Sequence, residues 1–488
     1  MPPAPHDRRC LQACHRRKRL QAVNSNAGKQ QESYEKKPPA LSLPTEVACA
    51  IFEEASKASP FSTGGVSLPG RELFAISQVC KAWRDIALDY SILWTTFAHS
   101  DRGPVKGLNR RTILHRLELH MQRSRGRPVD LWVDTLSPRL SDGFYGAFVR
   151  HMDRWRRASF KINPSAVGVL QSTVQSIVAS NLESFKCVPS HDNALPHFHF
   201  LSLRLNAPKL ATLHTEFRVL RYWHPSTVIR ELEFNQWSYE DSDRLPWSTF
   251  LDVISSSTLS KLTLRALKGG TMFKLPTEAD KARRVDTNLE RLYCSDPRVA
   301  EAMWGFIRSA RRLQGLSFDS LGVYSKWDIL QVAMDNGFDL LEKNTHRRFP
   351  ALNSVFLINC SISKANFECL AKMTPRVAAL GVTASRTMNE MPVDVLMSRE
   401  EKIGERIVWP TLKIIRANIK DLKRAQYNSY SGFLLRRSRM EKHCNSCKLL
   451  LYTPEADLWK EKDAEGWGKL LNAGVVCDAG ERVMGERL

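Results

Sequence analysis

The hexapeptide 259-LSKLTL-264 decides how most of this 488-residue chain is expected to fold. Its apolar residues stand at the first, fourth and sixth positions, a spacing typical of a strand that buries one face. The same pattern recurs at 155–160, 182–187, 229–234, 289–294, 313–318, 352–357 and 377–382, with weaker matches at 210–215 and 412–417. A further match at 200–205 begins only ten residues before that at 210–215, too close for a helix between them.

The residues around these matches are stronger evidence for a strand at each position than the matches themselves. With 43% apolar residues, the pattern would occur by chance at roughly 8% of positions. Turn-forming residues stand one or two positions before seven of the matches: Asn181, Pro208, Thr258, Asn288, Pro350, Pro375 and Pro410. Successive matches begin 19 to 39 residues apart, which is the period of a solenoid with one strand and one helix per turn.

We therefore expect an α/β fold in which a curved parallel sheet with outer helices extends over residues 101–422. The helical spacing of 108–124 and the alternation of 128–134 predict a helix and then a strand at its start. Helices such as 297–313 and 363–373 would cover the outer side. The repeated pattern is interrupted at 268–288 and 383–409, where we expect loops. Such loops often contain the residues that bind a partner.

Upstream, two short amphipathic helices are expected. Pro44 suits the first turn of a helix, where its missing N–H has no partner, and Glu46 complements the positive helix end. Val47, Ile51 and Ala55 follow at intervals of four residues, with Phe52 beside them. Residues 56–70, rich in Ser, Gly and Pro, predict a loop.

A single longer helix should follow this loop. Its main face is formed by Leu73, Ile76, Cys80, Trp83 and Ala87, spaced by three or four residues, and is broadened by Val79 and Ile86. The chain is expected to turn at 89–91 and to fold back at Trp94. So few residues cannot cover this much apolar surface by themselves, so part of it requires a partner.

These residues resemble a known family. Leu43-Pro44, Glu46, Ile51-Phe52, 76-ISQVCKAWRDIA-87 and 92-ILW-94 follow in order the motif of the F-box, in the F-box-like variety common in fungal proteins with leucine-rich repeats. The long segment 56–70 departs from the pattern. The resemblance implies that residues 38–100 dock on the Skp adaptor of a cullin-RING (SCF-type) ubiquitin ligase, beside its cullin scaffold. Degenerate leucine-rich repeats would then select a protein substrate.

The resemblance also assigns residues. It implies that the adaptor-binding side chains are Leu43, Pro44, Ile51, Phe52, Val79 and Cys80. Trp83 and Trp94 would form the core of the module. An apolar helix face that enters a partner's groove suits this role. The alternative is a helical pair buried against the following domain.

Charge is spread unevenly along the chain. The formal net charge is +21, and residues 1–37 hold nine Lys or Arg against three Asp or Glu. This segment lacks an apolar period, so we expect a disordered basic tail, in which 15-HRRKRL-20 is a candidate nuclear-import signal. Residues 101–488 carry +17, which favours an acidic or phosphorylated substrate and would also suit nucleic acid.

Cysteine usage and hydropathy predict the compartment. The eleven cysteines are scattered without framework spacing, as is typical of reduced thiols in the cytoplasm or nucleus. No apolar run approaches the length of a membrane span.

No catalytic or cofactor motif is found, so we expect a non-catalytic protein without a metal. Cys444 and Cys447 have zinc-knuckle spacing but lack a second pair, and Cys10 with Cys14 is a weaker candidate. The histidines at 191, 197 and 199 are expected to be ordinary surface and core residues and not metal ligands.

Residues 423–488 form a basic segment of unclear role. Within it, 436-RRSRMEKH-443 is either a phosphate-binding stretch or a solvated helix face. The other reading of the whole chain is a basic solenoid scaffold or nucleic-acid binder, but stacking aromatic residues interleaved with basic ones are missing.

Overall fold

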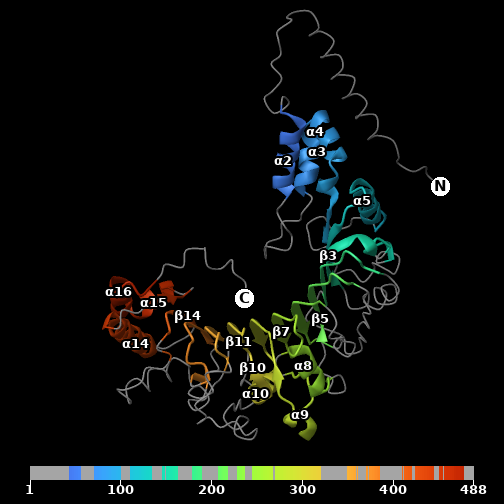
Figure 1. The fold of residues 1–488 in the computed structure, drawn as a ribbon. Coiled ribbons are helices and arrows are strands. Elements are labelled where there is room, and N and C mark those ends of the chain that lie inside the picture. Colours follow the sequence, from blue (N-terminus) through green and yellow to red (C-terminus); the bar gives the residue numbers. More distant parts are fainter. Residues whose placement is uncertain are drawn as a thin grey trace, which may run out of the picture.

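A computed structural model gives the fold of the chain (Figure 1). It describes residues 43–56, 71–100, 110–134, 146–148, 150–162, 178–189, 207–217, 228–236, 244–267, 270–319, 349–358, 360, 370–371, 373–384, 409, 411–419, 424–443, 450–453 and 456–476. The predicted tail at 1–37, the match at 200–205 and residues 385–408 of the predicted loop at 383–409 lie outside these ranges.

One large parallel sheet organises the described part of the chain. In this part of the chain, thirteen strands lie side by side in sequence order, and all neighbours are parallel. The strands are β1 (Thr96–Ser100), β2 (Val129–Asp134), β3 (Trp155–Ile162), β4 (Ser184–Pro189), β5 (Thr212–Glu216), β6 (Glu231–Asn235), β7 (Lys261–Arg265), β9 (Arg291–Cys294), β11 (Gly315–Asp319), β12 (Ser354–Ile358), β13 (Ala379–Ala384), β14 (Ile414–Ile419) and β15 (Leu450–Tyr452). The prediction of a large parallel sheet is confirmed.

The apolar pattern marks the strands. Each of the ten matches outside 200–205 overlaps one of β3 to β7, β9 and β11 to β14. Residues at the fourth position of the pattern pair laterally, as Leu232, Leu262 and Leu292 do, and each of these three is at most 2% exposed. Because side chains alternate along a strand, this register places one continuous apolar row on one face of the sheet.

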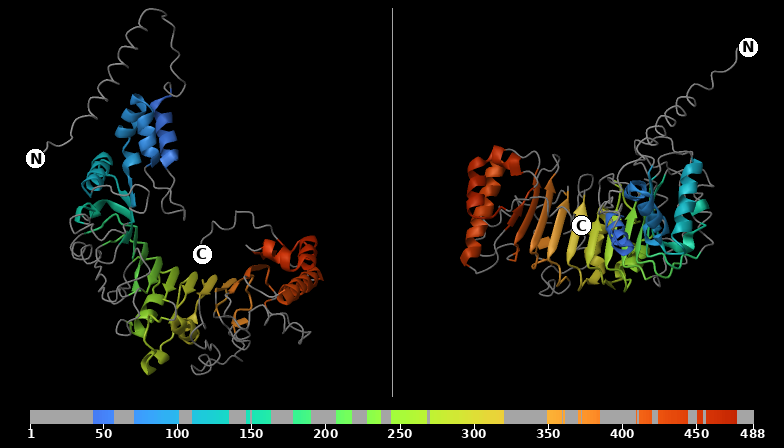
Figure 2. Two further views of the ribbon diagram at one scale, coloured as in Figure 1. Left: turned by 180° about the vertical axis from the view of Figure 1, so that it is seen from behind. Right: turned by 90° about the horizontal axis from the view of Figure 1, so that it is seen from above.

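Helices cover that apolar face. The sheet curves into an arc, and the helices lie along its convex side (Figures 1 and 2). They are α5 (Arg110–Arg123), η3 (Met152–Arg154), α8 (Trp247–Ile254), α9 (Glu278–Ala282) and α10 (Pro297–Phe306). Leu117 of α5, Phe250 of α8 and Val299 of α10 are buried in the same core as the strands.

Two of the expected segments differ from the structure. The predicted loop at 268–288 contains α9 and β8 (Val285–Asp286), because Thr277 and Asp280 form a capping box that starts a helix. The predicted helix at 297–313 ends at Phe306. The chain then enters β10 (Ile307–Ser309), which pairs with β8 in a second, two-stranded sheet.

The sheet also continues past its predicted end at 422. Strand β15 pairs with β14, and three helices close this end: α14 (Arg424–His443), α15 (Ala456–Lys462) and α16 (Ala464–Asn472). The buried Asp463 carboxylate accepts hydrogen bonds from the Ser431 hydroxyl at 2.6 Å and from the Gly466 N–H at 3.0 Å. Arg437 is 2% exposed and donates to the carbonyl of Trp409, so the basic stretch at 436–443 is not simply a solvated helix face.

A close contact on the concave side gives a test of the strand register. A Cβ atom added to Gly381 of β13 would lie 2.1 Å from the ring of Phe356 on β12, so Gly381→Ala should destabilise the fold by about 1–3 kcal/mol. Removing the ring with Phe356→Ala should relieve this cost. Denaturant unfolding of both single variants and the double variant measures the coupling; additive effects would contradict the register.

Candidate docking surface of the N-terminal helices

The module that precedes the sheet contains three helices and a short turn. These are α2 (Thr45–Ser56), α3 (Arg71–Val79), α4 (Lys81–Asp89) and the 3-10 helix η2 (Ser91–Trp94). The single longer helix expected after residue 70 is therefore wrong, because the chain breaks at Cys80. Its backbone is extended, with φ −156° and ψ 172°, and its sulfur accepts a hydrogen bond from the Trp83 N–H at 3.4 Å. Cys80 caps α4 and is only half-buried.

The module has a small core of its own. It consists of Ala48, Phe52, Ile76, Ala87, Leu93 and Trp94, with Trp83 partly buried against it. The Phe52 and Trp83 rings meet edge to face with centroids 5.0 Å apart. The Trp94 Nε1 donates to the carbonyl of Ala87 at 2.8 Å, which connects η2 to α4. Trp94 is thus part of this core, and Trp83 packs against it.

Phe52 belongs to this core and not to the surface. Its side chain is 0% exposed, whereas Ile51 beside it is 44% exposed. The expectation that Phe52 faces an adaptor is therefore corrected. Successive residues of a helix point about 100° apart, so one member of this apolar pair turns inward toward Ala48 and the other outward.

An apolar stripe, called the α2 stripe, consists of Leu43, two residues before the helix begins, and of Val47 and Ile51 on the outward side of α2. These residues are 37%, 43% and 44% exposed and follow one another at intervals of four. Val79, at the end of α3, is 59% exposed, and Pro44 is exposed as well. Half of the large exposed hydrophobic side chains in the described part of the chain belong to this small module. Val47 was missing from the expected contact set, although its spacing from Ile51 could have placed it there.

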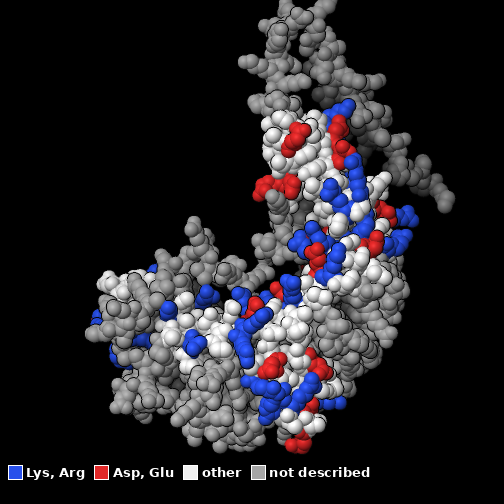
Figure 3. All heavy atoms as spheres, in the orientation of Figure 1, with Lys and Arg blue, Asp and Glu red and all other residues white. Residues whose placement is uncertain are grey.

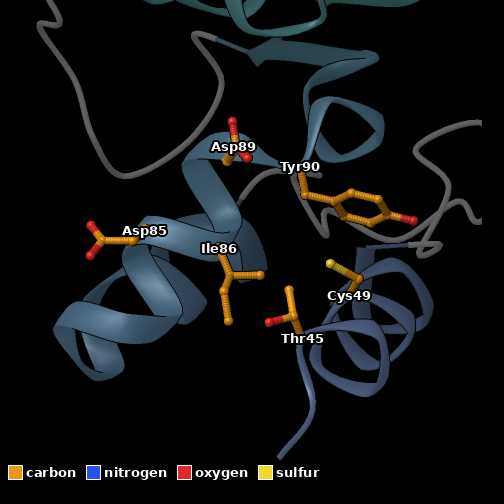
Figure 4. Close-up of a pocket in the computed structure, with 6 residues that line it drawn as sticks. All are labelled: Thr45, Cys49, Asp85, Ile86, Asp89 and Tyr90. Atoms are coloured by element: carbon orange, nitrogen blue, oxygen red, sulfur yellow. The ribbon is translucent and has the colours of Figure 1, made fainter.

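A pocket lies between α2 and α4 (Figure 4). It is lined by Thr45, Cys49, Asp85, Ile86, Asp89 and Tyr90. The figure shows the Ile86 side chain pointing toward α2, while the Asp85 carboxylate points away from it. Burial raises the pKa of the Cys49 thiol, so this sulfur is protonated at neutral pH and is a poor nucleophile. Since successive helix residues point about 100° apart, Thr45 and Cys49 place the pocket on a different side of α2 from Val47 and Ile51.

The module is attached to the sheet through Trp94. Its ring meets the His120 ring of α5 edge to face at 4.9 Å, and the Arg123 guanidinium lies 4.3 Å from the Trp94 ring centroid. The Arg127 Nε donates to the Ser91 hydroxyl at 2.9 Å. Since η2 leads directly into β1, these contacts hold the helices against the first end of the sheet.

Comparison with known protein families identifies the module. Residues 40–100 match the F-box-like family model, so this part of the chain is an F-box-like domain. Such domains are typical of non-catalytic subunits and imply binding to a Skp-type adaptor. No curated protein matches the chain.

Metal sites and membrane-spanning helices are absent from the described residues. Within these ranges, no group of three or more His, Cys, Asp or Glu side chains could hold a metal ion. None of the helices described is long and apolar enough to cross a membrane. The cysteine pairs at 10 and 14 and at 444 and 447, and the histidines at 191, 197 and 199, lie outside the described ranges.

The opposite orientations of Phe52 and Ile51 give a stability test. Phe52→Ala should cost about 3–5 kcal/mol, because it leaves a cavity against Trp83. Ile51→Ala removes a side chain that is already half in water and should change stability little. Limited proteolysis, with cleavage sites identified by mass spectrometry, should show rapid cutting between residues 43 and 100 only in the Phe52 variant. Equal protection of both variants would contradict the placement of Phe52.

His120 makes the attachment to the sheet sensitive to pH. Burial lowers its pKa to about 4, while the unfolded chain keeps a value of about 6.5. The unfolded state therefore binds the proton first as the pH falls. The contribution of His120 is complete above about pH 6.5 and declines toward pH 4, with about 2 kcal/mol lost by pH 5.

The variant His120→Phe keeps a ring against Trp94 but cannot be protonated. Its melting temperature should fall less between pH 7 and pH 5 than that of the unaltered protein. Identical pH slopes for the two proteins would show that His120 does not titrate in this way.

Proposed function

We propose that this protein is a substrate-recognition subunit of an SCF-type cullin-RING ubiquitin ligase. The F-box-like domain would bind the Skp adaptor and so connect the chain to the cullin scaffold. The sheet that follows would hold a protein substrate for ubiquitin transfer by other subunits. In this role the chain performs no covalent chemistry itself, and it would act in the cytoplasm, the nucleus or both.

The exposed α2 stripe carries this proposal. Leu43, Val47 and Ile51 each leave roughly 40% of their surface in water, although the core of the same module buries Phe52 completely. Covering side chains of this size in a partner's groove should contribute about 1 kcal/mol or more each. Helix-in-groove recognition uses apolar residues at this helical spacing.

The architecture of the sheet supports its role as a receptor. Strands that follow one another in sequence order, with helices on the convex side, support a degenerate leucine-rich-repeat solenoid. We propose that residues 101–476 form such a domain. Its concave face would present the polar side chains of successive strands to a partner.

The distribution of charge limits what this face would bind. Lys and Arg gather over the region of α5 and β3 (Figure 3), where the described residues from 110 to 162 hold eleven Lys or Arg against four Asp or Glu. Near the middle of the sheet the signs alternate, with Glu231 and Glu233 on β6 and Lys261 and Arg265 on β7. The concave surface is thus mixed in charge near the middle of the sheet, which suits a protein better than a nucleic acid.

The proposal predicts a specific loss of adaptor binding. Val47→Ala combined with Ile51→Ala should weaken binding to a purified Skp-type adaptor by about ten-fold or more, since two apolar contacts are truncated. Val178→Ala combined with Val228→Ala is the matched control, because those valines are 51% and 50% exposed and lie outside the module. Calorimetric titration measures both. Unchanged affinity in the α2 variant, or equal loss in the control, would reject the proposed contact.

A further inference from the structure

On the concave face of the sheet, side chains at equivalent positions of neighbouring strands lie next to one another and form rows. On β7 and β9, Leu262, Leu264, Leu292 and Cys294 are buried toward the helices, so the residues between them face the concave side. In register across the sheet, Lys261 lies beside Arg291, and Thr263 beside Tyr293.

A hydrogen-bonded chain ties the middle of this face together. The Asn235 side chain lies 2.6 Å from the His214 Nε2, and His214 lies 3.1 Å from a Glu233 carboxylate oxygen. The same oxygen accepts from the Arg265 Nε at 2.9 Å, and the Arg265 guanidinium lies 4.6 Å from the Tyr293 ring centroid. The Tyr293 hydroxyl donates to Asp319 of β11. Side chains from five strands, β5 to β11, thus form one polar network on the concave face.

Two cations beside this network, Lys261 and Arg291, take no part in it. Lys261 is half-exposed and Arg291 is exposed, and neither side chain makes an ion pair or hydrogen bond with any described residue. Gly315 follows Arg291 in the same row and carries no side chain; a Cβ atom added there would lie 3.8 Å from the Arg291 Cγ and 3.3 Å from the Ser354 Oγ. Because Glu231 precedes Lys261 in this row, the local excess is close to one positive charge.

The concave positions become mostly apolar on the neighbouring strands. On β12 to β14 they hold the half-exposed Phe356, Ile358, Ala379 and Ile414, together with Ser354, Gly381 and Arg416. The Phe356 ring lies against Gly381, and the Arg416 guanidinium lies 5.9 Å from the ring centroid. Counted from Arg291 on β9, the apolar side chains of Phe356 and Ile414 thus stand two and four strands further along the sheet.

We propose that this face binds an extended acidic segment of a protein substrate, with a Glu or Asp side chain at Lys261 and Arg291 and a large apolar side chain at Phe356 and Ile414. Adjacent strands lie about 4.8 Å apart, so the two sites are separated by roughly 10–19 Å. An extended chain advances about 3.3 Å per residue, so the two anchoring side chains should stand roughly three to six residues apart. A single carboxylate matches the local excess of one charge better than a doubly charged phosphate does.

This inference rests on the proposed function, because it names the substrate class of the receptor. It is tested with the full chain bound to its Skp-type adaptor and a phage-displayed library of short random peptides. The selected peptides should share an acidic residue and a large apolar residue at a constant separation within this range. Selection of phosphorylated over acidic synthetic versions of those peptides would reject the carboxylate assignment.

Two variants separate the sites. Lys261→Ala combined with Arg291→Ala should lower the affinity of selected peptides by about five-fold or more and remove the acidic preference only. Ile414→Ser should remove the apolar preference only. Lys274→Ala combined with Arg308→Ala, cations away from the concave strands, is the control and should change neither preference.

The result that would overturn the inference is a library without the paired preference, or a preference that persists in both concave variants. Adaptor binding is measured on the same samples. If the concave variants still bind the adaptor but select no common peptide, the substrate assignment fails while the proposed function stands. If the adaptor is not bound at all, the proposed function fails first.

Discussion

The structure depends on one constraint, the in-register pairing of parallel strands. Leu232, Leu262 and Leu292 lie side by side because the register aligns equivalent residues of β6, β7 and β9. A shift of one residue in any strand would turn its apolar residues to water and its polar residues into the core. The buried row and the concave row are therefore set together, and the charges of Lys261 and Arg291 lie in one line as a consequence.

The N-terminal module follows a different principle. Its core is small, and its helices bury only one side of α2, so Phe52 is covered and Ile51 is not. Trp94 belongs to the module core and also contacts His120 and Arg123 of the first outer helix. An F-box-like domain attached in this way would hold the sheet in a defined orientation toward any adaptor that covers the α2 stripe.

Much of this fold could be predicted from the sequence, because the apolar pattern repeats on every turn. The matches located ten strands, but β15 was missed because only three residues pair after a long helical segment. The break at Cys80 was missed for a physical reason: α3 and α4 preserve the three-and-four spacing across it, so periodicity alone cannot reveal a sulfur cap.

The docking surface could be predicted only in part. Ile51 and Phe52 are equally apolar neighbours, and which of them points inward depends on where Trp83 packs. Net charge also misled, since a total of +17 over residues 101–488 does not show that Glu233 balances Arg265 on the concave face. Such pairings require the register between strands that are about thirty residues apart in sequence.

Hydrogen–deuterium exchange of the full chain, with and without a purified Skp-type adaptor, tests the central claim most directly. If the bare apolar side of α2 is the surface that the adaptor covers, the amides of residues 45–56 should exchange more slowly in the complex. The concave strands β5 to β12 should be unchanged. Protection confined to the sheet, or no change in α2, would contradict the account.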